Sequence, residues 1–316
     1  MTFQFKRAIR EQVGLLVGLA GGTGSGKTFS AMRLAAGIAG DKPFAVIDTE
    51  AGRAKHYADQ FCFDHGDLAA PFDPQAYAEA ILAADAAHYP VIVVDSMSHE
   101  WAGAGGVLEM QEAELDRMAG DDWKKREAVK MAAWIRPKMA HKKMVQRLLQ
   151  VRAHLIICFR AEEKIEMVRD DKGKMQIVPK ASLTGINGWI PVCEKNLPFE
   201  LTASFLLTAD APGMPKPIKL QEQHRPMFPT DKPINEESGR KVAAWAAGGA
   251  IKDDQESHRQ SIRMADSLPL LQQAFEKAWQ SAKKGSDARK EFQALYDERK
   301  AALTGSPVTE ASEPTI

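Results

Sequence analysis

The segment that most constrains this chain is glycine-rich. It reads GGTGSGKT over residues 21–28 and matches the pattern G-x-x-x-x-G-K-[ST] throughout. An apolar run typical of a buried strand, residues 13–20, precedes it, and residues 28–39 have the pattern of a helix. In that context a glycine loop wraps closely around phosphate groups, and the N-terminus of the following helix adds positive charge. We therefore predict a nucleotide-phosphate site formed by Gly21, Gly22, Thr23, Gly24, Ser25, Gly26, Lys27 and Thr28.

Two cofactors follow from this loop, ATP and Mg²⁺. We expect Lys27 to bridge the β- and γ-phosphates of ATP and the hydroxyl of Thr28 to bind the magnesium ion. A second magnesium residue is expected at the end of a neighbouring strand, and Asp95 closes the apolar run VIVVD at residues 91–95. An aspartate there is also a common turn cap, but beside a complete phosphate loop the magnesium role is favoured.

Hydrolysis of ATP also needs a residue that orients or deprotonates the attacking water. Glu50 follows the short apolar run at residues 44–48, and Glu100 lies five residues after Asp95. A carboxylate in either place is also stabilised at the N-terminus of a helix. Spacing alone does not separate the two candidates.

The order of apolar runs and helical patterns predicts the fold class. Continuous apolar runs at residues 13–20, 44–48, 91–95 and 155–159 alternate with helical stretches, including 74–88 and a long one at 123–151 that we expect to kink at Pro137. Strands of that kind are buried on both faces. We predict an α/β fold, a mostly parallel sheet between helices, with a C-terminal helical appendage.

Composition changes along the chain predict its division into parts. Residues 1–248 carry the alternating pattern, including a β-hairpin at 162–179, and we take them as one core. A polar stretch at 249–266 begins with two glycines and is expected to be a linker. Residues 267–303 predict a helical hairpin, and residues 304–316 are expected to be disordered.

Composition also limits the cellular setting. Lys+Arg and Asp+Glu both number 42, so net charge indicates neither a nucleic-acid nor a membrane partner. The three cysteines are far apart and form neither a disulfide framework nor a metal quartet. No apolar run approaches the roughly 18 residues of a membrane span. We expect a protein of a reducing cytoplasm.

A local excess of positive charge lies within this neutral chain. Between residues 117 and 152 there are eleven Lys and Arg against three Asp and Glu, with Trp123 and Trp134 among them. A basic helix can follow a phosphate backbone while aromatic side chains stack on bases. A solvated helix face with tryptophans in the core has the same pattern. The candidate DNA contacts are Lys138, Lys142, Lys143 and Arg147.

Several segments resemble the RecA-like branch of P-loop ATPases, over roughly residues 13–160. They are the phosphate loop, the I-D-x-E segment at residues 47–50 and the VVDS segment at residues 93–96. More closely, residues 1–248 resemble RecA-like nucleotide-binding proteins of tailed phages and prophages, some of them Sak-type single-strand annealing ATPases. Further segments of that resemblance are HLIICFRAEEKIEM and CEKNLPFELT.

The resemblance implies an ATPase that acts on single-stranded DNA in recombination or replication, in the host cytoplasm if phage-encoded. It favours Glu50 over Glu100 as the catalytic base, and it implies rings or filaments that complete each ATP site. Where the family has a polar sensor this chain has Arg160, which is either a γ-phosphate sensor or a solvated charge. The role of Trp189, base stacking or an interprotomer pocket, stays open.

Two other functions fit the same residues. One is a nucleotide-dependent switch or scaffold that binds protein partners and no DNA. The other is a motor or loader for a helicase or for packaging. In the switch or scaffold the C-terminal helices are the expected partner-binding element. In the recombination reading they would bind a single-strand-binding or other recombination protein.

Overall fold

The computed structural model describes residues 14–169, 173–181, 188–248, 255–282 and 286–304. The chain divides into a larger unit, Arg10–Gly248, and a smaller one that contains Gly249–Ile316. Within the described residues, no helix is long and apolar enough to cross a membrane.

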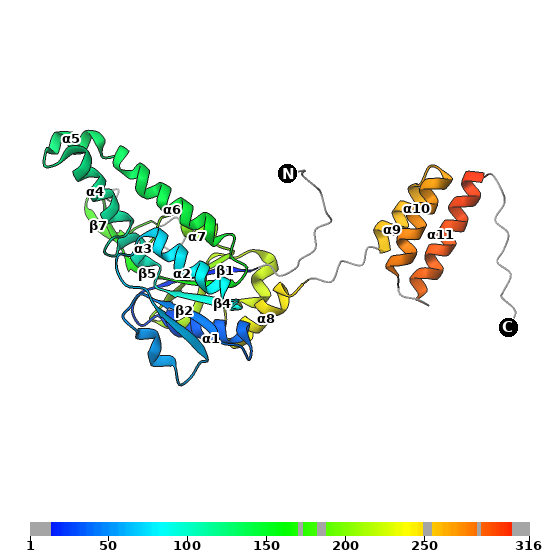
Figure 1. Ribbon diagram of the computed structural model, residues 1–316, viewed down its shortest axis with the longest axis horizontal. Helices are drawn as coiled ribbons and strands as arrows, with labels where there is room; N and C mark the ends of the chain where they lie inside the picture. The colour runs from blue at the N-terminus through cyan, green and yellow to red at the C-terminus, as the bar shows by residue number, and fades with distance from the viewer. Residues whose placement is uncertain (1–13, 170–172, 182–187, 249–254, 283–285, 305–316) are drawn as a thin grey trace. The chain divides into compact units, whose positions relative to one another are not determined.

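A single large sheet organises the larger unit (Figure 1). Along the sheet the order is β10-β9-β1-β5-β4-β2-β3, and every neighbouring pair is parallel except β10 with β9. A short strand, β8, pairs antiparallel with the end of β5. The predicted mostly parallel sheet between helices is therefore confirmed. The strands are β1 (Leu16–Gly21), β2 (Phe44–Asp48), β3 (Phe63–Asp67), β4 (Val91–Asp95), β5 (His154–Glu163), β8 (Trp189–Pro191), β9 (Ala203–Thr208) and β10 (Ala211–Lys219).

Two apolar layers cover the two faces of the sheet. Successive residues of a strand point to opposite faces, so in the β1 region Val17 and Leu19 pack in one layer while Leu16 and Ala20 pack in the other. The first layer contains α1 (Lys27–Ala39) and α8 (Glu236–Ala246), and the second contains α2 (Pro74–Ala86) and α6 (Ile135–Leu148). Burial on both faces is the reason these strands are continuously apolar.

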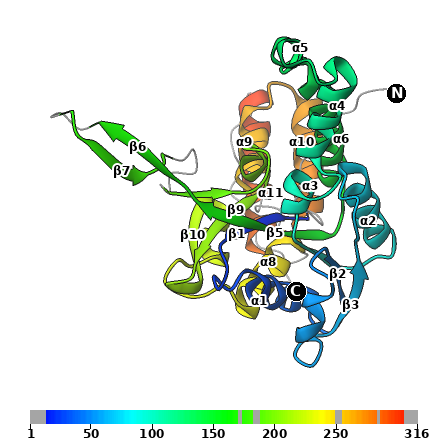
Figure 2. The same cartoon turned by 90° about the vertical axis from the view of Figure 1, so that its left-hand side faces the viewer.

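A helical arm between β4 and β5 carries the basic segment (Figure 2). It consists of α3 (Ser98–Ala102), α4 (Val107–Ala119), α5 (Trp123–Val129), the 3-10 turn η2 (Ala132–Trp134) and α6. The expected single helix with a kink at Pro137 is wrong, since the break lies before residue 135. Pro137 is the third residue of α6, where no intrahelical N–H bond is needed, so the helix accommodates it without a kink.

Shorter elements complete the larger unit. The predicted hairpin is present as β6 and β7, which pair antiparallel and form a sheet of their own. A 3-10 helix, η1, lies between β2 and β3. These elements are β6 (Ile165–Arg169), β7 (Met175–Pro179), η1 (Arg53–Tyr57), α7 (Leu197–Glu200) and η3 (Glu222–Met227).

In the smaller unit, the described residues form the helices α9 (Gln255–Met264), α10 (Leu268–Ser281) and α11 (Asp287–Thr304). Ile262, Leu271, Ala278 and Phe292 are buried between them. The expected linker at 249–266 therefore differs from the structure, because α9 occupies most of it. The sequence of α9 is polar because the helix buries mainly one large apolar side chain, that of Ile262. The expected disordered tail, apart from Thr304, lies outside the described residues.

Candidate functional site

The glycine-rich loop joins the end of β1 to the start of α1 and folds back on itself. The Ser25 hydroxyl donates to the Gly22 carbonyl oxygen at 2.8 Å, and the Lys27 Nζ atom donates to the same oxygen at 3.0 Å. Gly24 and Gly26 have φ of 75° and 79°, in the left-handed region that favours glycine. The loop thus has the compact shape that a phosphate-binding nest requires.

Trp189 packs against this loop from β8. A Cβ atom added at Gly22 would lie 3.0 Å from the Trp189 ring, so the glycine is what lets the indole approach the backbone. The ring is half-buried and joins the apolar layer of α2 and α6. Of the two roles left open for Trp189, neither is needed to explain this packing within the chain.

Thr28 and Asp95 meet across the sheet. The Thr28 hydroxyl, in the first turn of α1, donates to Asp95 Oδ2 at 2.6 Å. β1, β5 and β4 are neighbouring parallel strands. The loop after β1 and the last residue of β4 therefore lie at the same carboxyl-terminal end of the sheet. Burial raises the pKa of Asp95, and the hydrogen bond from Thr28 opposes that shift. The two predicted magnesium residues are therefore in direct contact.

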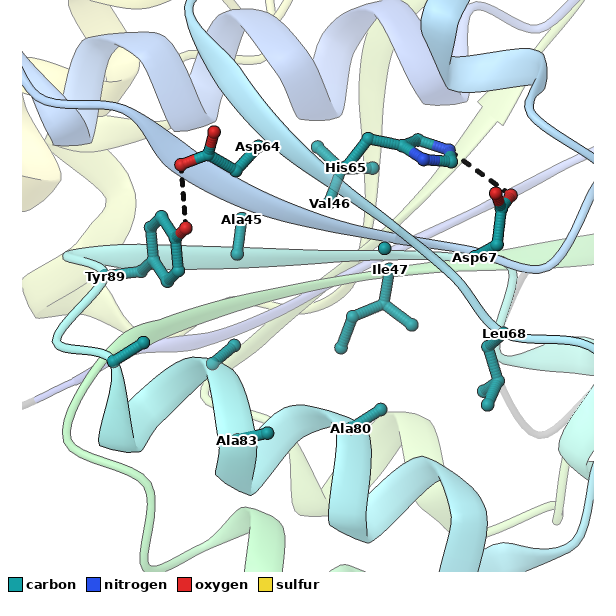
Figure 3. A pocket seen from close by; sticks show the side chains of 13 residues that line it. Ala45, Val46, Ile47, Asp64, His65, Asp67, Leu68, Ala80, Ala83 and Tyr89 are labelled. Atoms are coloured by element: carbon teal, nitrogen blue, oxygen red, sulfur yellow. Dashed lines mark hydrogen bonds and ion pairs between the residues drawn. The ribbon is translucent and has the colours of Figure 1, made fainter.

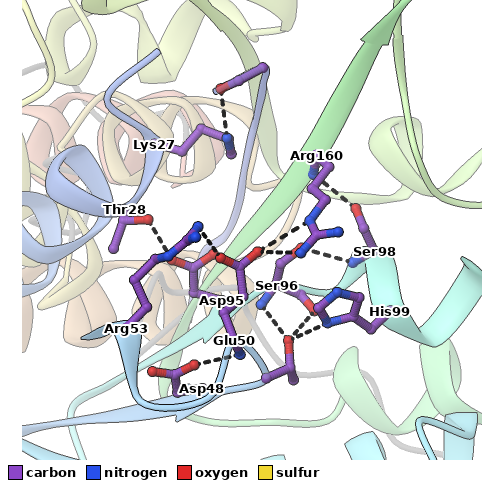
Figure 4. A network of polar contacts seen from close by, with 12 residues as sticks. Lys27, Thr28, Asp48, Glu50, Arg53, Asp95, Ser96, Ser98, His99 and Arg160 are labelled. Carbon is purple, nitrogen blue, oxygen red and sulfur yellow. Dashed lines mark hydrogen bonds and ion pairs between the residues drawn. The ribbon is translucent and has the colours of Figure 1, made fainter. Parts of the chain in front are cut away.

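Glu50 lies between two guanidinium groups (Figure 4). Arg160 approaches Glu50 Oε1, with its Nη2 atom at 2.8 Å and its Nε atom at 3.2 Å, and the Nη1 atom of Arg53 is 2.5 Å from Glu50 Oε2. The Glu50 side chain is 11% exposed, while those of the two arginines are 52% and 69% exposed. The largely buried Glu50 carboxylate is thus held by two solvent-facing cations.

Asp48 fixes the backbone that carries Glu50. Its carboxylate accepts the Glu50 N–H at 2.6 Å and the Ala54 N–H at 2.8 Å, and it lies 3.2 Å from His65 Nε2. We did not identify Asp48 or Arg53 as site residues from the sequence. Asp48 stands in the I-D-x-E segment, which was the available signal, whereas nothing in the spacing indicates Arg53.

A hydroxyl network joins the ends of β2, β4 and β5. Thr49 Oγ1 accepts the Ser96 N–H at 2.9 Å and lies 2.8 Å from His99 Nδ1, while Ser98 Oγ accepts the Arg160 N–H at 2.8 Å. Burial and the charge of Arg160 lower the pKa of His99. His99 therefore acts as a hydrogen-bonding partner of Thr49. Among the described residues, no group of three side chains could hold a metal ion.

Glu100 points into the protein, away from solvent. Its side chain is fully buried, and its Oε1 atom lies 2.9 Å from His141 Nδ1 of α6. The Glu100 Oε2 atom has no hydrogen-bond partner among the described residues. This glutamate joins α3 to α6 and has no path to bulk water.

In the folded chain, acidic side chains from outside the basic segment neutralise part of its positive charge. Arg126 pairs with Glu112 and Asp116, and Glu114 pairs with both Arg117 and Arg136. These carboxylates belong to α4. This helix packs beside α6, but its acidic residues precede residues 117–152, where the charge excess lies. The four candidate DNA contacts are all exposed on α6. Lys138 is distinct among them because its Nζ atom lies 5.6 Å from the Trp134 ring centroid.

A cavity of about 350 Å³ lies elsewhere, along the sheet edge (Figure 3). Small side chains of α2, including Ala80 and Ala83, form one wall, and β3 forms the other. Its rim is polar, where Tyr89 donates to Asp64 at 2.7 Å. None of the site residues predicted from the sequence lines this cavity.

Comparison with known proteins agrees with the loop geometry. A family model described as an AAA domain matches residues 14–190, more than half of the chain. The chain belongs to the AAA domain family. Its P-loop ATPase domain thus carries the nucleotide-binding loop characterised above, within the RecA-like P-loop NTPase fold.

One solved structure similar to this AAA domain is that of the KaiC-like protein PH0186 from Pyrococcus horikoshii OT3. It is 15% identical in sequence, the match covers 62% of this chain and 72% of that chain, and the TM-score is 0.32. No curated protein sequence matches the chain.

Proposed function

We propose that this AAA domain binds and hydrolyses ATP and acts on single-stranded DNA in recombination or replication, as a phage- or prophage-encoded ATPase. The observation that carries the catalytic part is the contact of Thr28 with Asp95 beside the phosphate loop, with Glu50 near enough for its charge to raise the pKa of Asp95. In this proposal the loop N–H groups and Lys27 bind the phosphates of ATP.

The donor set beside the loop fits magnesium. A threonine hydroxyl and an aspartate carboxylate in direct contact are oxygen ligands of the type that Mg²⁺ prefers. We infer that Thr28 and Asp95 hold the ion. When bound, magnesium would neutralise charge on the phosphate oxygens.

We assign the role of general base to Glu50. It follows β2 at the carboxyl-terminal end of the sheet, where the phosphate loop also lies, and its carboxylate keeps some contact with solvent. Glu100, the alternative candidate, is fully buried and bonded to His141, so an attacking water has no access to it. Burial thus supports the same choice as the family resemblance.

Arg160 is proposed as the γ-phosphate sensor. The guanidinium group of Arg160 binds Glu50 Oε1 and so engages the carboxylate that must accept a proton. The phosphates of ATP would compete for this cation, because a phosphate carries more charge than a carboxylate. We expect ATP to draw Arg160 from Glu50 and free the base.

Contact with single-stranded DNA is assigned to α6, whose exposed lysines and arginine form the candidate path. Rings or filaments of this chain would bring several such helices to one strand. A partner protein in recombination would bind the C-terminal helices.

A second candidate function is a switch that binds a protein partner, with no DNA. What favours it is the β6–β7 hairpin, where Ile165, Met167 and Ile177 are 62%, 71% and 67% exposed. Because residues opposite each other in an antiparallel pair share a face, these three side chains lie on one side of the hairpin. An exposed apolar face of this kind is typical of protein interfaces. A motor or loader for a helicase or for packaging would also act on DNA, and it would require ATP turnover that is stimulated by DNA and directional.

One experiment separates these functions. ATP turnover and gel shifts are measured with and without single-stranded DNA, with Lys27→Ala as the control that loses the phosphate counter-ion. We expect DNA binding by the wild-type chain, tighter binding with a non-hydrolysable ATP analogue, and neither nucleotide binding nor turnover in the variant. A wild-type chain that ignores single-stranded DNA in every nucleotide state would favour the protein-partner switch.

A further inference from the structure

A second cavity, of about 270 Å³, lies between α2 and α6. Ala78 of α2 and Met139, Ala140 and Met144 of α6 form an apolar floor, and Lys143 and Arg147 are part of the lining. The helices belong to the layer on one face of the sheet, whereas the phosphate loop leads into α1 on the other face. This α2–α6 pocket is therefore separate from the ATP site.

The pocket follows from the sequence of two helices. The lining positions of α6 are 136, 139, 140, 143, 144 and 147, which are spaced by three and four residues and form one helix face. Opposite them, α2 presents Ala78, whose small side chain leaves room above the floor. Lys138 and Lys142 fall outside this stripe.

Charge at the pocket is positive and incompletely neutralised. Arg136 pairs with Glu114, whose Oε1 atom is 3.1 Å away. Within the described part of the chain, Lys143 and Arg147 have no ion pair, and both side chains are exposed at the rim. An apolar floor beneath two free cations suits a ligand with a flat apolar body and an attached anion.

We propose that the α2–α6 pocket binds one nucleotide of a single DNA strand, with the base on the methionine and alanine floor and the adjoining phosphates on Lys143 and Arg147. This inference rests on the proposed function, because it supplies the place where the strand is held. Methionine sulfur makes favourable contacts with aromatic rings, so Met139, which is 54% exposed, can support any base above the buried Met144. A base in a duplex is stacked and paired and cannot enter, so the pocket selects single strands.

The four candidate contacts of α6 then separate into two pairs. Lys143 and Arg147 line the pocket, whereas Lys142 does not and Lys138 lies over the Trp134 ring. General attraction to a polyanion would treat the four alike. Binding in the pocket predicts that Lys143 and Arg147 contribute more to DNA affinity than Lys138 and Lys142 do.

The test uses the full chain and an oligothymidine with one central 2-aminopurine. Lys143→Ala and Arg147→Ala should each weaken binding roughly tenfold, the scale of a lost charged hydrogen bond. Lys142→Ala is the matched control, with the same charge change on the same helix, and should cost less than about threefold. Ala140→Leu fills the half-buried part of the floor without altering charge, and it should weaken binding and remove the fluorescence change of the 2-aminopurine.

Each result has a defined meaning, with folding checked by circular dichroism and by ATP turnover without DNA. Equal losses for Lys142→Ala and Lys143→Ala, or normal binding by Ala140→Leu, would overturn the pocket while the DNA function stands. Duplex DNA that binds as tightly and with the same variant pattern would overturn base insertion. If the wild-type chain binds no single strand, but a poly-glutamate decamer binds and is lost in Arg147→Ala, both the pocket assignment and the DNA function fail.

Discussion

The part of β5 that is paired in parallel runs from His154 to Arg160, and its two ends both carry a basic side chain with a different role. At the amino end, His154 Nδ1 accepts the Leu15 N–H at 3.1 Å and closes the sheet beside β1. At the carboxyl end, Arg160 reaches out to Glu50 and remains half exposed. The first is a fixed hydrogen bond between strands, and the second is an ion pair that a competing anion can break.

Burial explains this difference. Burial lowers the pKa of His154 to about 4, so the ring is neutral at pH 7 and its unprotonated Nδ1 atom accepts the Leu15 N–H. An arginine stays charged in any setting, and at the carboxyl end it meets the carboxylates that follow parallel strands. One end of the strand therefore stabilises the sheet, while the other is available for chemistry.

The largest expected effect tests the carboxyl end. Glu50→Gln should lower ATP turnover by about 10²-fold or more, because the general base is lost, while ATP binding is retained. Phosphate release gives the turnover, and calorimetry gives the affinity.

Glu100→Gln is the matched control for that substitution. Its side chain is buried against His141, so we expect a lower melting temperature and normal turnover by the folded protein. If Glu100→Gln removed turnover and Glu50→Gln did not, the assignment of the base would have to be reversed.

The next effect tests the amino end. The folded pKa of His154, about 4, is below the ordinary 6.5, so the unfolded chain binds a proton that the folded chain does not between those pH values. Stability is therefore full above pH 6.5 and falls by up to about 3 kcal/mol as the pH drops to 4. His154→Asn keeps an acceptor for Leu15 and should flatten this slope.

Urea unfolding at pH 7.5, 6 and 5 measures that slope, and ATP turnover at pH 7.5 should stay normal in the variant. Parallel stability curves for wild-type and variant chains would show that His154 is not the group that titrates. Lost turnover at pH 7.5 would contradict the division between the two ends of β5.

The sequence predicts the parts of this molecule whose signals are contiguous. The phosphate loop, the buried strands and the strand-end position of Asp95 each lie in a single run of residues, and the structure has the strands and the loop where they were expected. β3 was not predicted, because FDHGD is polar and lies at the exposed edge of the sheet, where burial imposes no apolar pattern.

Contacts between distant residues could not be predicted. Arg160 meets Glu50 across 110 positions of sequence, and His141 meets Glu100 across 41. The α2–α6 pocket likewise needs two helices that are separate in the chain. The acidic partners of the basic segment were missed for the same reason, because α4 lies beside α6 only once the arm has folded.

The smallest expected effect concerns the C-terminal helices. Residues 14–248 contain both apolar layers of the sheet, and the three C-terminal helices bury Ile262, Leu271 and Phe292 among themselves. Each unit thus has a core of its own, which is the usual mark of a part that folds alone. A chain ending at Gly248 should keep the wild-type melting temperature of the ATPase core, its ATP affinity and its turnover, all within about twofold for the rates and affinities. Calorimetry and phosphate release compare the shortened and full chains, and both should show the same losses when Lys27→Ala is added. Insolubility or lost nucleotide binding in the shortened chain would mean that the helices stabilise the core, and the independence of the two units would be overturned.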